Sequence, residues 1–124
     1  MIDWSLYPNF SENEMRCSCG CGRADMSPDF MAKLQTVRSF IKVPLIVTSG
    51  FRCPEYDEEI GGVGVHPTGH AADIAIYGRR AYDLLRLSVN VFWGIGIKQR
   101  GSGRFIHLDD LVSDAHPRPA LWTY

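Results

Sequence analysis

Two histidines and an aspartate stand close together in the stretch GVHPTGHAADIAI, residues 64–76, and a further histidine follows in RFIHLDD, residues 104–110. Imidazole and carboxylate groups are typical ligands of catalytic zinc sites, in which three protein ligands leave one position open for water. Zinc lowers the pKa of that water towards neutrality and polarises a carbonyl group, which is what peptide hydrolysis requires. The competing interpretation is that these histidines are ordinary surface or hydrogen-bonded groups of a small domain.

The alternation of side chains along two expected strands decides which of these groups can meet. In RFIHLDD the strand period of two puts His107 and Asp109 on one face, and in AADIAIY it puts Asp73 among small residues. A buried carboxylate on an apolar strand is costly unless it meets a cation or a metal. If the two strands pair and the glycine-rich loop folds back over them, His66, Asp73 and His107 converge. We therefore predict one zinc ion per chain on these three ligands, although spacing alone does not choose between His66 and His70.

Helix and strand signals predict the elements that must position these groups. Ser27 and Pro28 are typical of the cap and the first residue of a helix, which the apolar spacing extends to residue 41. In a second long helix, over residues 79–91, Tyr82, Leu85 and Val89 have helical spacing. We also predict a short helical turn near 11–17, a helix that begins near 53 and stops at 61–62, and strands over 45–49, 71–77, 93–98 and 104–110. The tail, residues 115–124, has two prolines and no periodicity. The predicted fold class is α+β, with helices packed on a small antiparallel sheet.

Length and composition place the chain among globular proteins. Its 124 residues fit a single domain over 1–124, and 45% hydrophobic with 22% charged residues is the usual balance for such a domain. The formal net charge is -1 and we find no run of basic residues, so neither nucleic acid nor a membrane is an expected partner. No stretch is apolar for the ~20 residues that a membrane helix needs. The first residues do not resemble a secretory signal, and we expect a chain made without one.

Four cysteines form the other group that could bind a metal. Cys17, Cys19 and Cys21 stand in RCSCGCG, and Cys53 follows well downstream in FRCPEY. A C-x-C-x-C run is not the C-x2-C pair of most structural zinc sites, and no second Cys or His pair lies at finger spacing. A structural metal and one or more disulfides remain alternatives. The sequence favours free thiols in a tight turn, and we predict that they are dispensable for hydrolysis.

The motifs around the histidines resemble a known enzyme family. The stretch TSGFRCPEYDEEIGGVGVHPTGHAADI, followed by GIGI, RFIHLDD and the closing PALWTY, closely resembles the zinc D-alanyl-D-alanine carboxypeptidase family. That family includes phage L-alanyl-D-glutamate endopeptidases and the vancomycin-resistance dipeptidases, and its fold is shared with the hedgehog signalling domain. The resemblance covers residues 9–124 approximately. It implies that His66, Asp73 and His107 bind zinc and that His70 does not.

The resemblance also suggests roles for residues beside the metal. Arg52 corresponds to the family arginine that contacts the substrate carbonyl or carboxylate, and a guanidinium offers forked donors that stay charged. Several branches carry an acidic general base three positions before the second zinc histidine, where this chain has Arg104. Asp109 is the nearest substitute, and we predict that it is the catalytic base or orients the attacking water; the alternative is that it only orients a zinc histidine. Gly64 stands where a serine is often found, which weakens a substrate hydrogen bond.

The function implied by the resemblance is zinc-dependent hydrolysis of peptidoglycan stem peptides, with zinc-bound water as nucleophile. The bond cut is either that of a D,D-carboxypeptidase or that of an L-Ala-D-Glu endopeptidase. The expected partner is the peptidoglycan peptide, the expected state is a monomer, and the expected source is a phage or prophage protein acting on the cell wall. Two other functions are considered: a non-catalytic phage structural or wall-binding module that keeps the zinc fold, and a signalling or scaffolding domain of hedgehog type.

Overall fold

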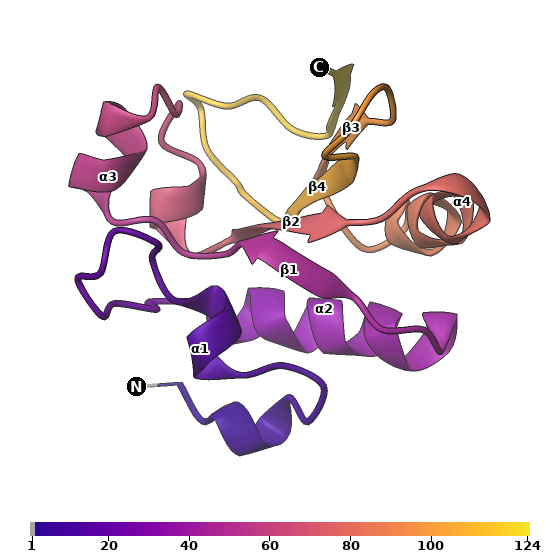
Figure 1. The fold of residues 1–124 in the computed structure, drawn as a ribbon, viewed down its shortest axis with the longest axis horizontal. Coiled ribbons are helices and arrows are strands. Elements are labelled where there is room, and N and C mark those ends of the chain that lie inside the picture. The colour runs from indigo at the N-terminus through magenta and orange to yellow at the C-terminus, as the bar shows by residue number, and fades with distance from the viewer. Residues whose placement is uncertain (1) are drawn as a thin grey trace.

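A computed structural model describes residues 2–124 of the chain (Figure 1). The helices are α1 (Glu12–Met15), α2 (Pro28–Ile41), α3 (Pro54–Glu59) and α4 (Gly78–Ser88), with 3-10 turns η1 (Trp4–Leu6) and η2 (His66–Thr68). The strands are β1 (Ile46–Ser49), β2 (Ala71–Ala75), β3 (Gly94–Lys98), β4 (Phe105–Asp109) and β5 (Ala120–Thr123). The α+β class predicted from the sequence is confirmed.

The five strands form one sheet in the order β1-β2-β4-β3-β5. The pairs β1/β2, β2/β4 and β3/β4 are antiparallel, but β3 and β5 are parallel. The antiparallel sheet expected from the sequence is found for three of the four pairs, and the parallel β3/β5 pair was not expected because it forms where the tail returns to the sheet edge. The tail carried no strand signal because β5 is an edge strand that follows two prolines and whose residues are at most partly buried.

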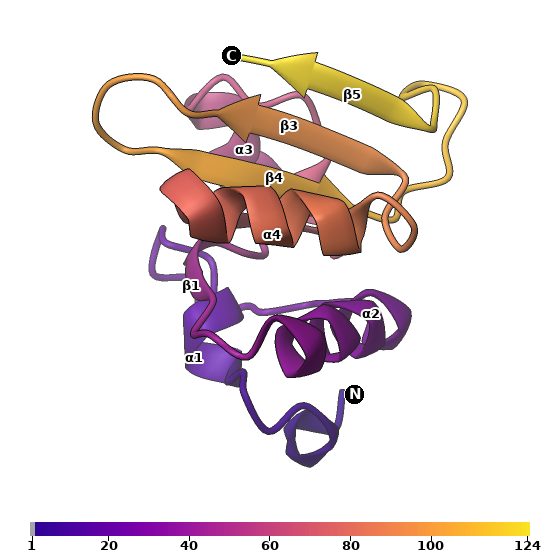
Figure 2. The same cartoon turned by 90° about the vertical axis from the view of Figure 1, so that its right-hand side faces the viewer.

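One face of the sheet is closed by α2 and α4, which lie together beneath the strands in Figure 2. The apolar side chains of β2 and β4 point to these helices and join the main core, in which Phe30, Leu34, Ile74, Ile106 and Leu108 are almost completely buried. Because side chains alternate along a strand, the neighbouring positions of β2 and β4 point to the opposite face. The polar residues that could do chemistry lie on that second face.

The two long helices differ in how well their sequences predict their buried faces. In α2 the Ser27 side chain accepts a hydrogen bond from the Phe30 N–H, so the predicted cap is confirmed, and Phe30, Leu34 and Val37 are buried at helical spacing. In α4 the helix is confirmed, but its buried residues are Ala81, Leu84 and Ser88 rather than the predicted stripe. Within α4 the buried set and the predicted set both have helical spacing. Only packing against the sheet decides which of the two sets is buried.

Of the predicted stripe of α4, Tyr82 and Val89 are exposed and Leu85 is partly buried. With Trp93, Leu121 and neighbouring residues this stripe lines an apolar cleft of about 510 Å³. This cleft contains no cluster of titratable or metal-ligating groups. None of the helices in residues 2–124 is long and apolar enough to span a membrane.

Candidate metal centre

The three predicted zinc ligands meet on the sheet face that α2 and α4 leave open. Asp73 on β2 lies directly across the antiparallel pair from His107 on β4. His66 reaches the same point from η2, and one ligand atom of each residue lies within 4.8 Å of the other two. All three residues are buried. The convergence expected from strand phase is therefore what the structure shows.

The loop before β2 fixes the direction of the His66 ring. Its Nδ1 lies 2.8 Å from the carbonyl oxygen of Gly50, which can only accept a hydrogen bond, so Nδ1 carries the proton. The chain then turns at Gly69 in the left-handed region, with φ 76°, where a Cβ would collide with the backbone oxygen of Asp25. The ring is thus locked with Nε2 towards Asp73, at 3.5 Å from Oδ2.

His107 lies between two carboxylates. Its Nδ1 is 2.9 Å from Oδ1 of Asp73, and its Nε2 is 2.7 Å from Oδ2 of Asp109. A neutral imidazole has one N–H, so both contacts are favourable only if the ring is protonated or a cation lies at one nitrogen. The Nε2 of His66 faces Asp73 in the same way. The residues therefore fit a metal ion bound by His66 Nε2, Asp73 and His107 Nδ1, with Asp109 holding the far side of the His107 ring.

The electrostatics keep the carboxylates ionised. Burial alone raises the pKa of Asp73, but hydrogen bonds and charge from His107 and His66 outweigh it and hold that pKa well below its usual range. Burial likewise opposes the shift in Asp109, yet His107 and Arg118 lower its pKa to about 2. For His107, burial lowers the pKa and the two carboxylates raise it, with a net increase. An anionic Asp73 is the form that binds a metal.

Asp109 is held from three sides and is completely buried. Arg118 donates to both of its carboxylate oxygens, from Nε at 2.9 Å and from Nη2 at 2.9 Å. The backbone N–H of Leu111 also donates to Oδ1. Gly94 on β3 passes so close that a Cβ there would collide with this carboxylate. These contacts fix Asp109 in one orientation, directed at the Nε2 of His107.

Arg52 is placed beside the metal centre by α3 and β1. Its Nη1 donates to Oδ1 of Asp57 at 3.0 Å and its Nε donates to Oγ of Ser49 at 3.0 Å. Its Nη2 lies 3.6 Å from Oδ2 of Asp73. Asp57 in turn accepts from the Gly64 N–H. The guanidinium is therefore braced on two sides.

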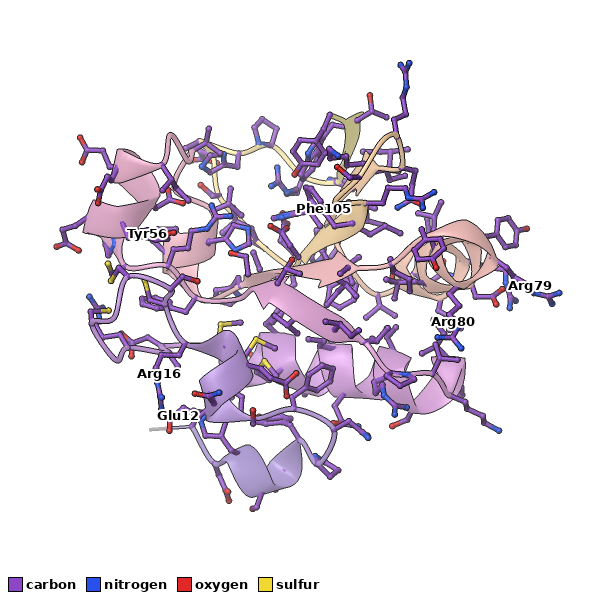
Figure 3. The ribbon with its side chains drawn as sticks, in the orientation of Figure 1. Glu12, Arg16, Tyr56, Arg79, Arg80 and Phe105 are labelled. Atoms are coloured by element: carbon purple, nitrogen blue, oxygen red, sulfur yellow. The ribbon has the colours of Figure 1, made fainter. Side chains whose placement is uncertain are left out.

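The three candidate metal ligands, together with Arg52 and Asp57, line a cleft of about 480 Å³, a volume typical of sites for small ligands. Figure 3 shows polar side chains filling the region between Tyr56 on α3 and Phe105 on β4, whereas Arg79 and Arg80 lie at the α4 end of the molecule. The C-terminal tail contributes four lining residues that sequence reasoning did not assign to the site: His116, Arg118, Trp122 and Tyr124. The closing PALWTY, residues 119–124, was part of the resemblance and pointed to Trp122 and Tyr124, whereas no sequence signal pointed to His116 and Arg118.

Other polar residues named from the sequence lie elsewhere. The Nδ1 of His70 contacts Oδ1 of Asp110 at 2.7 Å, and Lys33 donates to the other oxygen of Asp110 at 2.9 Å. His70 is thus engaged in a separate network and is not part of the metal-ligand group. Arg104, at the position where the resemblance led us to consider an acidic base, stacks over Tyr77, with its guanidinium carbon 4.4 Å from the ring centroid.

Two histidines and a carboxylate beside an arginine in a cleft define a candidate metal-dependent hydrolase. The family model of Peptidase M15 matches residues 8–109. The chain therefore belongs to the peptidase M15 family, which is a family of metallopeptidases. No curated protein matches the chain.

Proposed function

We propose that this protein is a zinc peptidase that hydrolyses a peptide bond in bacterial peptidoglycan. The observation that carries the proposal is the convergence of His66, Asp73 and His107, whose ligand atoms lie within 4.8 Å of one another. All three residues line the same cleft as Arg52. Three nitrogen and oxygen ligands are the arrangement of catalytic zinc, since a structural ion takes four protein ligands. Zinc bound there supplies Lewis acidity and lowers the pKa of a water towards neutrality.

Arg52 binds and polarises the substrate. Its guanidinium lies beside the metal ligands, so it offers forked donors to a carbonyl or carboxylate oxygen of the peptide. Because Ser49 and Asp57 brace it before substrate arrives, little reorganisation is needed when negative charge develops on that oxygen.

Asp109 acts as a positioning residue in this proposal. Its carboxylate lies against Nε2 of His107, while Nδ1 on the other side of the ring faces Asp73. A carboxylate in that place fixes the tautomer and orientation of a metal histidine. Its burial and its two hydrogen bonds from Arg118 support this role over that of a base that contacts water.

His116 is the group we propose for proton transfer. It lines the cleft, and among residues 2–124 its ring has no hydrogen-bond partner. Imidazole is the side chain most often used as a general acid or base. An unengaged ring is free to accept a proton from the attacking water and pass it to the leaving amine.

The substrate proposal rests on the family and on the sequence resemblance. Members named in that resemblance cleave stem peptides of the bacterial wall at either D-Ala-D-Ala or L-Ala-D-Glu bonds. In this proposal the chain is a phage or prophage protein that reaches the wall during lysis or infection and cleaves stem peptides there.

A non-catalytic, wall-binding module is the second candidate, and one observation favours it. The position where relatives carry the acidic base is Arg104, which stacks on Tyr77, and Asp109 is fully occupied. A protein of this kind would bind peptidoglycan and zinc but would release no new peptide termini.

Digestion of purified peptidoglycan separates the two candidates. The zinc-loaded protein and its His107→Ala variant are incubated with the same preparation, and new termini are identified by mass spectrometry. Peptidase activity gives new amino and carboxyl termini with the zinc-loaded protein alone, and their identity names the bond. Wall binding without new termini would refute the enzymatic proposal.

A further inference from the structure

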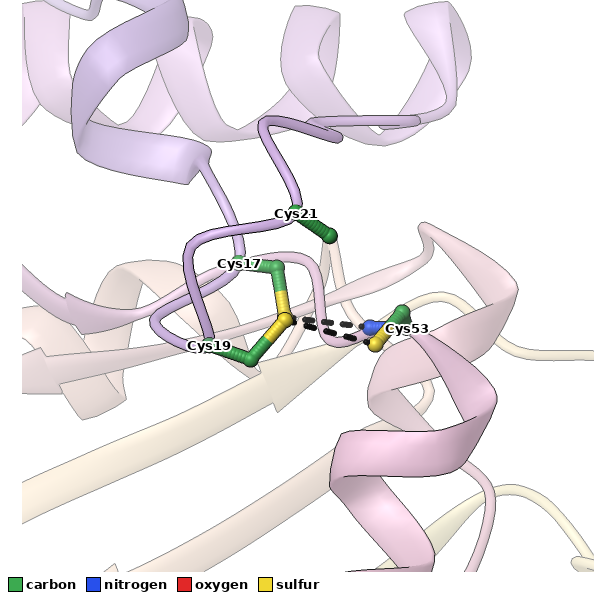
Figure 4. A group of neighbouring side chains, drawn as sticks. All are labelled: Cys17, Cys19, Cys21 and Cys53. Atoms are coloured by element: carbon green, nitrogen blue, oxygen red, sulfur yellow. Dashed lines mark hydrogen bonds between the residues drawn. The ribbon is translucent and has the colours of Figure 1, made fainter.

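The four cysteines come together at the start of α3, where Cys53 directly follows Arg52 in the chain. Their Sγ atoms all lie within 4.8 Å of one another. Two of the separations are 3.5 Å, between Cys17 and Cys19, and 3.6 Å, between Cys19 and Cys53. Figure 4 shows the loop of Cys17, Cys19 and Cys21 folded over Cys53 at the start of α3.

These separations match the geometry of a metal tetrahedron. With a zinc-sulfur bond of about 2.3 Å, two sulfurs at the corners of a tetrahedron are about 3.8 Å apart. Disulfide-bonded sulfurs lie at about 2.0 Å, far below the observed values. The Cys53 backbone N–H also donates to the Sγ of Cys17 at 3.3 Å, a contact that stabilises a thiolate. Four sulfurs at tetrahedral spacing are a set typical of zinc or of iron.

We propose that Cys17, Cys19, Cys21 and Cys53 bind a structural zinc ion. All four ligand positions are filled by protein, which leaves no place for water or substrate, so this ion has no part in hydrolysis. The thiols bind as thiolates and release their protons on loading. The inference stands on the cysteine geometry and is independent of the proposed peptidase activity.

The ion would join the N-terminal loop to the segment that positions the cleft. That loop is already docked there, because the Phe51 N–H donates to the Met15 carbonyl at 2.9 Å and Cys17 closes a turn with Arg23 at 2.8 Å. Gly50 packs so tightly on Met15 that a Cβ would lie 2.7 Å from its sulfur. The same segment supplies the Gly50 carbonyl to His66 and carries Arg52. A metal at Cys53 therefore holds both in place.

Metal analysis of variants tests the site without using activity. In the full-length His66→Ala/His107→Ala protein the cysteines are the sole proposed site. We expect it to retain one zinc per chain and, after exchange for cobalt, to show thiolate-to-cobalt charge-transfer absorption and the intense visible bands of tetrahedral cobalt. Adding Cys19→Ser should abolish that absorption and the tight zinc. Adding Ser18→Ala, an exposed neighbour in the same loop, should change neither.

Thiol protection in the unaltered protein keeps the test decisive if a variant fails to fold. The protein is purified under reducing conditions and loaded with zinc. All four of its cysteine thiols should then resist a thiol reagent, and they should react once a strong chelator is added. Rapid modification of the zinc-loaded protein, a disulfide within the cluster, or iron in place of zinc would overturn the proposal.

Discussion

The two candidate metal-ligand groups of this molecule differ in donor type, in the number of ligands and in the room they leave for a substrate. These differences distinguish a catalytic metal site from a structural one. His66, Asp73 and His107 offer three hard or borderline donors and line a cleft with Arg52. The four cysteines offer soft sulfur donors that complete a tetrahedron by themselves. Three ligands in a cleft leave room for a reacting group, whereas four closed around an ion leave none.

Both groups share one segment of chain, and this makes the comparison testable. Gly50 and Arg52 serve the cleft, and Cys53, the next residue, joins the sulfur cluster. Damage to the cleft ligands should abolish turnover and spare stability. Damage to the sulfur cluster should lower stability first and turnover least.

The largest effect is expected from His107→Ala. Removing one of three ligands should release the cleft metal and reduce peptide hydrolysis to the level of a protein-free control. Metal analysis together with a hydrolysis assay measures both. The matched control is His70→Ala, which should keep metal and activity because His70 belongs to the Asp110 network. A His107→Ala protein with full activity would remove this residue from the site.

Replacement of His116 tests the assignment of proton transfer. Loss of a general acid or base typically lowers the rate by about 10²–10⁴-fold. We expect a decrease of that size in kcat for His116→Gln, with zinc content and melting temperature unchanged, and loss of one limb of the pH-rate profile. An unaltered pH profile and rate would show that another group moves the proton.

Arg52→Lys separates positive charge from the forked donor geometry. Removal of one preorganised donor to a developing negative charge typically costs about 10²–10³-fold in kcat. Lysine keeps the charge but cannot contact Ser49, Asp57 and substrate together, so a loss in that range is expected in steady-state kinetics. Wild-type kcat in the lysine variant would mean that Arg52 only braces the fold.

Asp109→Asn distinguishes a positioning carboxylate from a base. A residue that orients a metal ligand changes metal affinity by about 10–100-fold when it is replaced. We expect that loss of zinc affinity in a competition titration, and recovery of most activity at saturating zinc. Asp110→Asn is the adjacent control and should leave zinc affinity unchanged. Full affinity with a rate reduced by about 10²-fold or more would instead identify Asp109 as the base.

The smallest effect on turnover is expected from Cys19→Ser. The variant should unfold at a lower temperature than the wild type, while Ser18→Ala should not, because only the former loses a ligand of the sulfur cluster. Hydrolysis per folded molecule should change less than in His107→Ala, His116→Gln or Arg52→Lys. A folded Cys19→Ser protein that keeps its cleft zinc yet has no activity would show that the cluster takes part in catalysis.

Two of the cleft ligands, Asp73 and His107, could be predicted from sequence because side chains alternate along a strand, whereas only the resemblance preferred His66 over His70. Once β2 and β4 pair with Ile74, Ile106 and Leu108 facing the core, Asp73 and His107 must share the opposite face. The cysteine cluster could not be predicted, since Cys53 joins the other three only after β1 and α1 pack together. The cleft wall from the tail was missed for a similar reason: β5 gains its partner only when the chain returns to β3.

Metal reconstitution of the cleft tests the central claim most directly. The protein is stripped with a chelator and titrated with zinc while the release of new peptide termini from peptidoglycan is followed. If His66, Asp73 and His107 hold the catalytic metal, activity is absent from the stripped protein, returns as zinc fills the cleft site, and never returns in His107→Ala. Equal hydrolysis by stripped and reloaded protein would contradict the account.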